Sequence, residues 1–284
     1  MPDLSIILLT KNGMPLLEQT LKQIYAQEID RSFEVIAVDS GSTDGTLELL
    51  AKYPVRLIRI PPQQFNFGAT RAMAYDLAEG EFCITLSQDA VPADPSWLAE
   101  MVAPFSDPSV AAVRGEQKLG PGSHYFYWAR IGRYYVTRSA VRWRARYGFT
   151  FSNVNSAIRK STWDQNRIGP AEMSEDKFLQ KVWVDRGIRF VRATKAVVYH
   201  GHNFNLKTLI RRSENEGLGN RLSGQTYSLW DALMDTLDIQ NWIAFWRGLV
   251  TRQITTEAEF LSPFIRPFLI WKGNRFNQKY YGSD

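Results

Sequence analysis

The chain has 284 residues and a formal net charge of +5, and its hydrophobic fraction of 44% with a charged fraction of 22% excludes an intrinsically disordered protein. Cys83 is the only cysteine and lies within an apparent strand, so we expect no disulfide framework, no thiolate metal site and a reduced, cytoplasmic setting. We expect no signal peptide, because the start of the chain has no basic region, and no membrane span, because no apolar run approaches ~20 residues.

The first hundred residues alternate between strand and helix patterns. Short apolar runs predict four strands: LSIILLT (4–10), FEVIAVDSGSTDG (33–45, ending in a turn), VRLIRI (55–60) and EFCITLS (81–87). Helical spacing predicts three helices between them, at 15–27, 46–53 and 68–80. This alternation predicts a parallel sheet with right-handed crossovers.

Polar residues follow three of these strands. The segments are TKN (10–12), DSGSTDG (39–45) and SQDA (87–90). In parallel sheets ligands bind outside the carboxyl ends of the strands, so three polar ends at one edge favour a site over plain turn chemistry. The glycine pattern of a dinucleotide site and the lysine loop of a P-loop are both absent, so neither of those binding modes is supported.

The charge is unevenly distributed along the chain. Residues 1–100 carry seven Lys/Arg against fourteen Asp/Glu, whereas residues 114–168 carry eleven against two. A basic stretch of this kind indicates a solvated surface, an anionic ligand or an anionic membrane surface. We expect no nucleic-acid partner, because no helix-turn-helix, zinc-finger or RNA-binding signature accompanies the arginines.

The second half of the chain has a different pattern. We predict helices in the aromatic and arginine-rich segment 124–149, a strand and turn in FSNVNSAIRKSTW (151–163), and a helix in SEDKFLQKVWVDRG (174–187). Extended structure follows in RFVRATKAVVYHGH (189–202), and the tail from about residue 226 is helical and rich in Trp, Phe, Leu and Ile.

Five fragments occur in the order seen in glycosyltransferase family 2, which the sequence therefore resembles over residues 3–215. They are SIILLTKN, EVIAVDSGSTDGT, FGATRAMAYDLAEGEFCITLSQDAVP, SEDKFL and VYHGH. The resemblance implies an α/β GT-A fold, with a Rossmann-like nucleotide-sugar half at 1–113 and an acceptor and catalytic half at 114–222. A helical extension would occupy 223–284. Within the family, FNFGATR and SQDAVP look most like rhamnosyltransferases that use dTDP-L-rhamnose.

The resemblance implies a divalent cation, Mg²⁺ or Mn²⁺. Enzymes of this fold hold it with an Asp-x-Asp motif, and the SQD of this chain keeps only the second carboxylate, Asp89. Related enzymes complete the metal shell with a histidine that follows the catalytic base, a place that His200 fits. The alternative is that Asp89 simply closes a strand.

A nucleotide site is implied at the same edge. Asp39 resembles the carboxylate that accepts a hydrogen bond from the N3–H of a pyrimidine base, a contact that does not separate uracil from thymine. The other residues expected at the nucleotide or its phosphates are Thr10, Lys11, Asn12, Arg71 and Gln88. Two departures from the rhamnosyltransferase pattern, Phe67 and Ala72, mean that contacts made by those side chains elsewhere are lost or replaced.

Inversion requires one displacement, in which a positioned base takes the proton of the acceptor hydroxyl. Asp176 matches the family's base at the start of a helix. A helix N-terminus lowers the basicity of a carboxylate, and burial beside Glu175 raises it. The alternative is that this acidic segment merely caps the helix. Residues expected to face the acceptor are Asn153, Asn155, Glu175 and His202.

These patterns predict an inverting, metal-dependent glycosyltransferase that moves L-rhamnose from dTDP-L-rhamnose to a glycan or lipid-linked acceptor in cell-surface polysaccharide synthesis. A UDP-sugar donor is one alternative, and a catalytically silent nucleotide-sugar-binding or scaffold protein is another. The aromatic tail could lie on the inner face of the cytoplasmic membrane, with arginines meeting anionic lipid, or pack against the rest of the protein.

Overall fold

The computed structural model describes residues 1–121, 125–169, 171 and 173–278. The chain folds into two compact units. The sheet unit comprises residues 1–118 and 151–200, and the helical unit comprises residues 119–150 and 201–284. The division expected after residue 222 falls at the end of a long helix inside the helical unit, and the last six residues of the expected extension lie outside the described residues.

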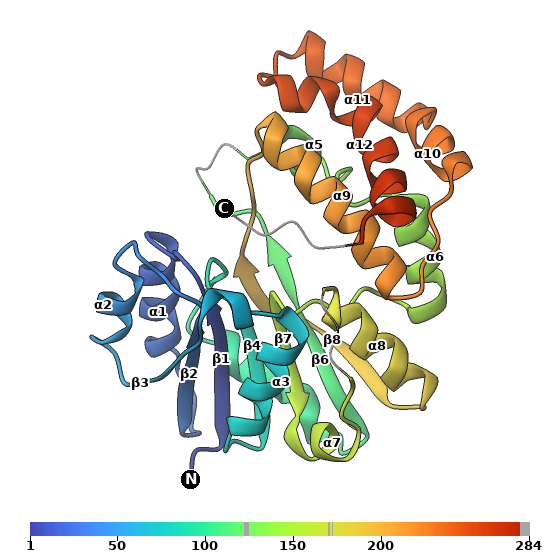
Figure 1. The fold of residues 1–284 in the computed structure, drawn as a ribbon. Helices are drawn as coiled ribbons and strands as arrows, with labels where there is room; N and C mark the ends of the chain where they lie inside the picture. Colours follow the sequence, from blue (N-terminus) through green and yellow to red (C-terminus); the bar gives the residue numbers. More distant parts are fainter. Residues whose placement is uncertain (122–124, 170, 172, 279–284) are drawn as a thin grey trace. The chain divides into compact units, whose positions relative to one another are not determined.

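The described strands of the sheet unit form one eight-stranded sheet (Figure 1). Its order is β3-β2-β1-β4-β7-β6-β8-β5. The strands are β1 (Leu4–Thr10), β2 (Phe33–Asp39), β3 (Val55–Arg59), β4 (Phe82–Ser87), β5 (Val91–Pro92), β6 (Val110–Lys118), β7 (Asn155–Arg159) and β8 (Arg189–Tyr199). The predicted parallel pairing is confirmed for β1 to β4, whereas β7 runs antiparallel to both β4 and β6 and makes the sheet mixed.

Helices cover both faces of this sheet, because the side chains of each strand alternate between two cores. Leu4, Ile6 and Leu8 point into one core and Ile7 into the other. The first core contains residues from α1 (Leu16–Tyr25), α2 (Thr46–Leu50) and α4 (Trp97–Val102), followed by the short 3-10 turn η2 (Ala103–Ser106). The second core contains residues from α3 (Phe67–Leu77), α7 (Lys160–Gln165) and α8 (Glu175–Asp185). A short 3-10 turn, η1 (Pro62–Gln64), precedes α3.

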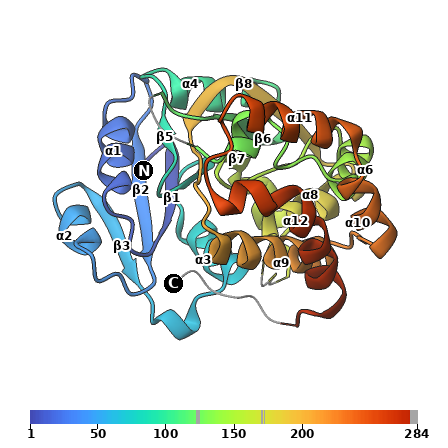
Figure 2. The same cartoon turned by 90° about the horizontal axis from the view of Figure 1, so that it is seen from above.

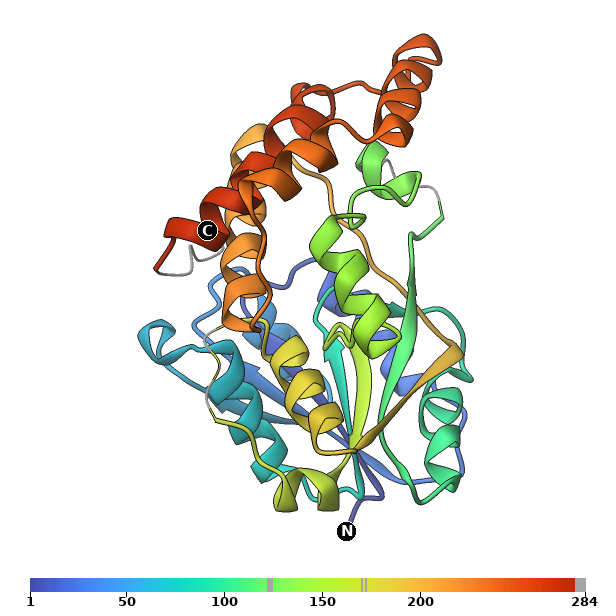
Figure 3. The ribbon, with the colours of Figure 1, turned by 90° about the vertical axis from the view of Figure 1, so that its right-hand side faces the viewer.

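The helical unit is built around two long helices in close contact. Its helices are α5 (Tyr127–Arg130), α6 (Arg138–Tyr147), α9 (Leu206–Leu222), α10 (Leu229–Thr236), α11 (Ile239–Val250) and α12 (Glu257–Phe276). α12 packs along α9 and contacts α10 and α11 (Figures 2 and 3). A Cβ added at Gly217 of α9 would meet backbone atoms of α12, and one added at Gly273 would meet the backbone of Glu214. The backbones therefore approach more closely than side chains would allow.

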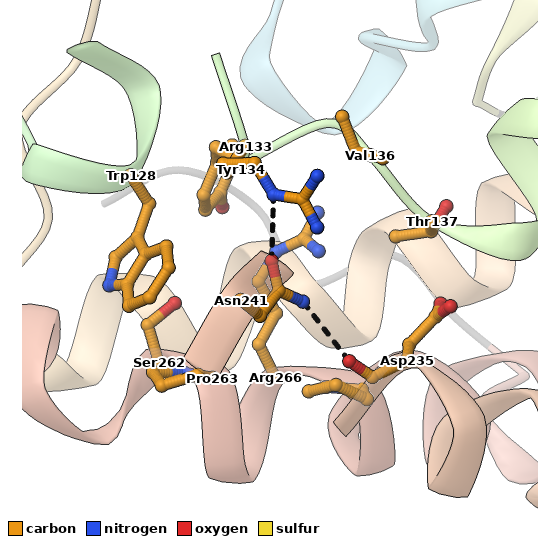
Figure 4. A pocket seen from close by; sticks show the side chains of 11 residues that line it. Trp128, Arg133, Tyr134, Val136, Thr137, Asp235, Asn241, Ser262, Pro263 and Arg266 are labelled. Carbon is orange, nitrogen blue, oxygen red and sulfur yellow. Dashed lines mark hydrogen bonds between the residues drawn. The ribbon is translucent and has the colours of Figure 1, made fainter. Parts of the chain in front are cut away.

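A small pocket with polar and apolar lining lies inside the helical unit (Figure 4). Arg133 Nε donates to Asn241 Oδ1 at 2.9 Å, and Asn241 Nδ2 donates to the backbone oxygen of Asp235 at 3.1 Å. Arg266 is buried with its guanidinium 4.2 Å from the ring centre of Tyr134. These contacts fix the start of α11 to the segment before α6. Among the helices of the described residues, none combines the length and the apolar character needed to cross a membrane.

Candidate active site

The shortest strand of the sheet brings Asp89 to His200. β5 begins two residues after Asp89, and its Val91 pairs with Tyr199, the last residue of β8. The pairing leaves Asp89 and His200 just beyond the ladder, with His200 Nε2 3.5 Å from Asp89 Oδ1. His200 is fixed further by its backbone N–H, which donates to the Lys118 oxygen at 2.9 Å. Two residues that are distant in the sequence therefore meet at the edge where β4 and β8 end.

Ser87 orients the carboxylate of Asp89. Its Oγ donates to Asp89 Oδ1 at 2.6 Å. Ser87 therefore stands where an Asp-x-Asp motif has its first aspartate, and it contributes a hydroxyl group in place of a carboxylate. A set of one carboxylate and one imidazole fits a divalent ion that keeps several waters. The imidazole nitrogen suits a first-row ion such as Mn²⁺ better than Mg²⁺, which takes mainly oxygen ligands. Asp89 and His200 together are thus a chemically consistent pair of cation ligands.

The side chain of Gln88 forms hydrogen bonds with the backbone of Lys11. Its Nε2 donates to the backbone oxygen of Lys11 at 3.0 Å, and its Oε1 accepts from the Lys11 N–H at 3.0 Å. This two-point contact holds the end of β1 beside the end of β4. Thr10 is also buried, and its Oγ1 donates to Asp39. The nucleotide contacts expected of the Thr10 and Gln88 side chains stay predictions beside these contacts within the fold.

Asp39 is fully buried and its carboxylate accepts four hydrogen bonds. The donors are Thr10 Oγ1, the Gly41 and Ser42 N–H groups and Ser42 Oγ, at 3.0, 2.9, 2.9 and 2.5 Å. A carboxylate offers about four lone-pair sites, so these donors occupy them all. The N3–H of a base would have to displace one of them. In this structure Asp39 shapes the loop after β2.

Among the residues expected at the nucleotide, Lys11 and Asn12 are exposed. Asn12 has a φ of 46°, its N–H donates to Ser42 Oγ at 2.9 Å, and its Oδ1 accepts from the Thr43 N–H at 2.9 Å. Asparagine tolerates this left-handed conformation better than most residues. Asn12 therefore fixes the loop backbone, and Lys11 adds a cation at the surface beside it.

Arg71 forms a buried ion pair with Glu175. Arg71 Nε donates to Glu175 Oε1 at 3.0 Å, and Asn153 Nδ2 donates to the same oxygen at 3.0 Å. The side chains of Arg71 and Glu175 are only 9% and 11% exposed, so the pair is largely removed from water. Arg71 was expected at the nucleotide, and Asn153 and Glu175 at the acceptor. The structure joins the three in one network, and their contacts with nucleotide and acceptor stay predictions.

Asp176 lies next to this pair and has a different environment. Burial and the negative charge of Glu175 raise its pKa to about 6. The Lys177 N–H donates to Oδ1 at 2.7 Å and the Asn153 N–H approaches Oδ2 at 3.4 Å, and both oppose the rise. The arginine offsets the charge of Glu175, while Asp176 keeps an elevated affinity for a proton. A carboxyl group with a pKa near 6 is suited to proton transfer near neutral pH.

The loop before β7 connects Asp176 to the cation ligands. Asn153 contacts Asp176, and the next residue, Val154, accepts a hydrogen bond through its oxygen from the Ser87 N–H at 3.0 Å. Ser87 in turn donates to Asp89. A short chain of contacts thus places the base candidate and the cation candidates on one edge of the sheet.

Asn155 makes contacts within the fold, and its expected place at an acceptor stays a prediction. It is fully buried, accepts from Trp97 Nε1 at 2.9 Å, and donates to the backbone oxygens of Glu116 and Ala196 at 3.0 and 2.9 Å. Both N–H groups of this side chain are therefore used within the fold. His202 belongs to the helical unit, where its ring lies 6.2 Å from that of Phe204.

A model of glycosyl transferase family 2 matches residues 5–165, more than half of the chain. The chain belongs to glycosyl transferase family 2. It is 26% identical to the O-antigen chain rhamnosyltransferase WbaN of Salmonella anatum, over 77% of this chain and 72% of the relative. It is 28% identical to the O-antigen chain rhamnosyltransferase RfbN of Salmonella typhimurium, over 76% and 71%. This family 2 glycosyltransferase is therefore a distant relative of O-antigen rhamnosyltransferases.

Solved structures show the same fold. The mannosyltransferase PcManGT of Pyrobaculum calidifontis, in complex with GDP-Man and Mn²⁺, is 15% identical with a TM-score of 0.64, covering 98% of this glycosyltransferase and 88% of that chain. Glucosyl-3-phosphoglycerate synthase of Mycobacterium tuberculosis, in complex with Mn²⁺, UDP-glucose and phosphoglyceric acid, is 16% identical with a TM-score of 0.58, covering 79% and 81%. The expected GT-A fold is thereby confirmed.

Sequence reasoning missed two features of the site in this glycosyltransferase. One is the orienting hydroxyl of Ser87, for which the adjacent SQD motif is a usable signal. The other is the pairing of Arg71 with Glu175, which lie 104 residues apart and carry no local signature of contact.

The Arg71–Glu175 pair generates a stability prediction. Arg71→Met leaves a buried carboxylate without its cation, so we expect the free energy of unfolding to fall by about 3–5 kcal/mol in urea titrations. Adding Glu175→Gln should recover much of that loss. The control is Arg189→Met, because Arg189 pairs with Asp107 on the surface and exposed pairs contribute at most about 1 kcal/mol. Equal losses from Arg71→Met and Arg189→Met would contradict the buried pair.

The raised pKa of Asp176 generates a prediction about pH. The folded state holds this proton more tightly than the unfolded state, so the carboxyl stabilises the fold at acidic pH, and this contribution is lost as the pH rises from about 4 to about 6. Asp176→Asn removes it. The excess free energy of unfolding of the wild type over the variant should therefore fall by about 1–3 kcal/mol between about pH 4 and pH 7. A difference that stays constant across that range is the opposing result.

Proposed function

We propose that this protein is an inverting glycosyltransferase that moves L-rhamnose from dTDP-L-rhamnose to a glycan or lipid-linked acceptor in cell-surface polysaccharide synthesis. The observation that carries the transfer chemistry is the continuous set of contacts from Asp176 through the 153–154 loop to Ser87, Asp89 and His200. The choice of rhamnose is supported by the two O-antigen rhamnosyltransferases that are similar over most of the chain.

Each carboxylate has a separate task in this proposal. Asp89 and His200 would hold a divalent ion, which offsets the negative charge on the diphosphate as the nucleotide leaves. Asp176, with a pKa of about 6, accepts the proton of the acceptor hydroxyl as its oxygen attacks the anomeric carbon opposite the diphosphate. Inversion follows, because the new bond forms on the face opposite the one that breaks.

The ion pair between Glu175 and Arg71 sets the charge next to Asp176. With Arg71 Nε on Glu175 Oε1, the negative charge beside the base is partly offset, which keeps Asp176 available in its ionised form near neutral pH. Asn153 bridges the two carboxyl groups, donating to Glu175 through its side chain and facing Asp176 with its backbone N–H. Arg71, Asn153 and Glu175 are therefore proposed as positioning residues for Asp176.

A UDP-sugar donor is the second candidate, favoured by the fold-level likeness to a synthase solved with UDP-glucose. A carboxylate that accepts the N3–H of the base, the role expected of Asp39, would not separate uracil from thymine, because both bases offer that donor. One extra methyl group in a hydrophobic pocket contributes only ~1–3 kcal/mol, so the sugar has to supply much of the preference.

Calorimetry tests the donor and the cation together. We expect dTDP-L-rhamnose to bind more tightly than UDP-glucose, and to bind more tightly with Mn²⁺ than with chelator. Asp89→Asn and His200→Ala should each reduce the Mn²⁺-dependent affinity by at least ~10-fold, as losses around metal sites do. The control is Asp94→Asn, whose carboxylate only accepts from the Ser96 N–H and Oγ. Tighter binding of UDP-glucose than of dTDP-L-rhamnose would refute dTDP-L-rhamnose as the donor. Equal affinity with Mn²⁺ and with chelator would show that donor binding does not use a metal ion.

The role of Asp176 is tested by transfer assays. Asp176→Asn keeps the side-chain shape but cannot accept a proton, so we expect transfer to fall by ~10²–10⁴-fold while donor affinity hardly changes. Folding should survive, because Asn caps a helix about as well as Asp. If Asp176 only caps α8, the Asn variant will transfer at the wild-type rate, and a catalytically silent protein will show no transfer in either form.

A further inference from the structure

The helix α11 presents a stripe of apolar side chains to solvent. Ile239, Ile243, Trp246 and Val250 are 68%, 62%, 59% and 81% exposed. At 100° per residue, these four positions fall within an arc of about 60° on one face of the helix. Scattered single apolar residues are normal on protein surfaces, but four on one face form a continuous strip.

The opposite face of α11 is firmly packed, so the stripe is not the result of a detached helix. Phe245 is buried and contacts the ring of Phe264 at 5.2 Å between centroids. Trp242 Nε1 donates to the Thr236 oxygen at 3.0 Å, and a Cβ at Gly248 would meet the ring of Tyr127. The helix is held with its apolar stripe outward.

The apolar surface continues into α10. Trp230 and Leu237 are 67% and 63% exposed, and Leu229 and Leu233 of the same helix are also exposed. Leu237 is joined to Ile239 by one residue, Asp238, which caps α11 by accepting from the Gln240 N–H at 2.8 Å. The two helices therefore present consecutive apolar side chains across their junction.

The charged side chains of α11 and the turn after it have one sign, and the three aspartates of the adjoining α10 segment, Asp231, Asp235 and Asp238, pair with Arg142, Arg138 and Arg133. Residues 239–256 contain Arg247 and Arg252 and no acidic residue. Both arginines are exposed, and Arg247 follows Ile243 and Trp246 on the adjoining part of the helix surface. Tryptophan and aliphatic side chains on one face with arginine beside them are the composition of a helix that lies in a lipid interface.

A second copy of the chain fits this surface less well. A two-fold dimer places the same patch on both subunits, so Arg247 and Arg252 would meet the same arginines, while the aspartates of the patch, Asp231, Asp235 and Asp238, already pair with arginines of their own chain. Anionic lipid headgroups offer the complementary charge, and the acyl boundary accepts the apolar stripe.

We propose that the outer face of α10 and α11, formed by Trp230, Leu237, Ile239, Ile243, Trp246 and Val250 with Arg247 beside them, docks on an anionic lipid surface. The proposal concerns where the enzyme works and does not depend on which sugar it transfers. It agrees with the finding that no helix of the described residues can cross a membrane, because the helix lies parallel to the surface.

Vesicle sedimentation of the full chain tests this. We expect binding to phosphatidylcholine vesicles that contain phosphatidylglycerol, and clearly weaker binding to pure phosphatidylcholine or at high salt. Ile243→Ser with Trp246→Ser should weaken binding at least ~10-fold, because two apolar side chains that enter the lipid interface on binding are lost. Arg247→Gln should weaken it about fivefold on anionic vesicles only. The matched control is Val141→Ser, an exposed apolar position on α6.

Circular dichroism should show unchanged melting for these variants, since all the substituted side chains are exposed. Absence of sedimentation of the wild type with anionic vesicles would overturn the proposal. So would a concentration-dependent dimer in sedimentation velocity that the Ile243→Ser, Trp246→Ser variant abolishes, because the stripe would then be a contact between copies. Equal loss of vesicle binding in the Val141→Ser control would also count against this face.

Discussion

The insertion of β7 between β4 and β6 is the constraint on which the site depends. β7 runs antiparallel to both neighbours, so its first residue, Asn155, lies opposite Leu86 near the end of β4. The loop that enters β7 is thereby placed at the edge where the parallel strands finish. A parallel strand at this position would have put that loop at the opposite edge, far from Asp89.

The same loop organises the charge of the site. Asn153 contacts both Glu175 and Asp176. Ionising two adjacent, partly buried carboxyl groups costs free energy, because the two negative charges repel each other and are poorly solvated. The fold resolves this by giving Glu175 an arginine and leaving Asp176 with backbone donors. Unequal environments for paired carboxylates are a common way to assign one a structural task and the other proton transfer. Here the inequality comes from α3, which supplies Arg71 from the other half of the sheet unit.

The fold of residues 4–87 was predictable because its information is local. Each strand of β1 to β4 is a short apolar run, and each helix has its own periodicity, so neighbouring residues suffice to define it. The antiparallel pairing of β7 depends on residues far apart in the chain. β5 has only two residues, too few for a periodic pattern, yet it brings Asp89 to His200.

The site was predictable in part for a related reason. Sequence position indicates which residues stand at strand ends but not whether a side chain turns outward. Asp39 and Asn155 are polar residues at the right edge that turn inward and satisfy backbone groups or loops. Glu175 and Asp176 are adjacent in the sequence, so the effect of one charge on the other could be expected, but the partner Arg71 could be found only from the folded chain, because nothing in either local sequence marks the contact.

The contact between α9 and α12 has a consequence for divergence among proteins of this fold. Gly217 and Gly273 each face backbone atoms of the opposite helix, so neither position has room for a methyl group unless the crossing widens. A replacement at one glycine cannot be compensated by shrinking a side chain on the other helix, since no side chain is there to shrink. We therefore expect proteins that keep this helix crossing to keep glycine at these two positions, whereas the solvent-facing residues of the same helices can vary.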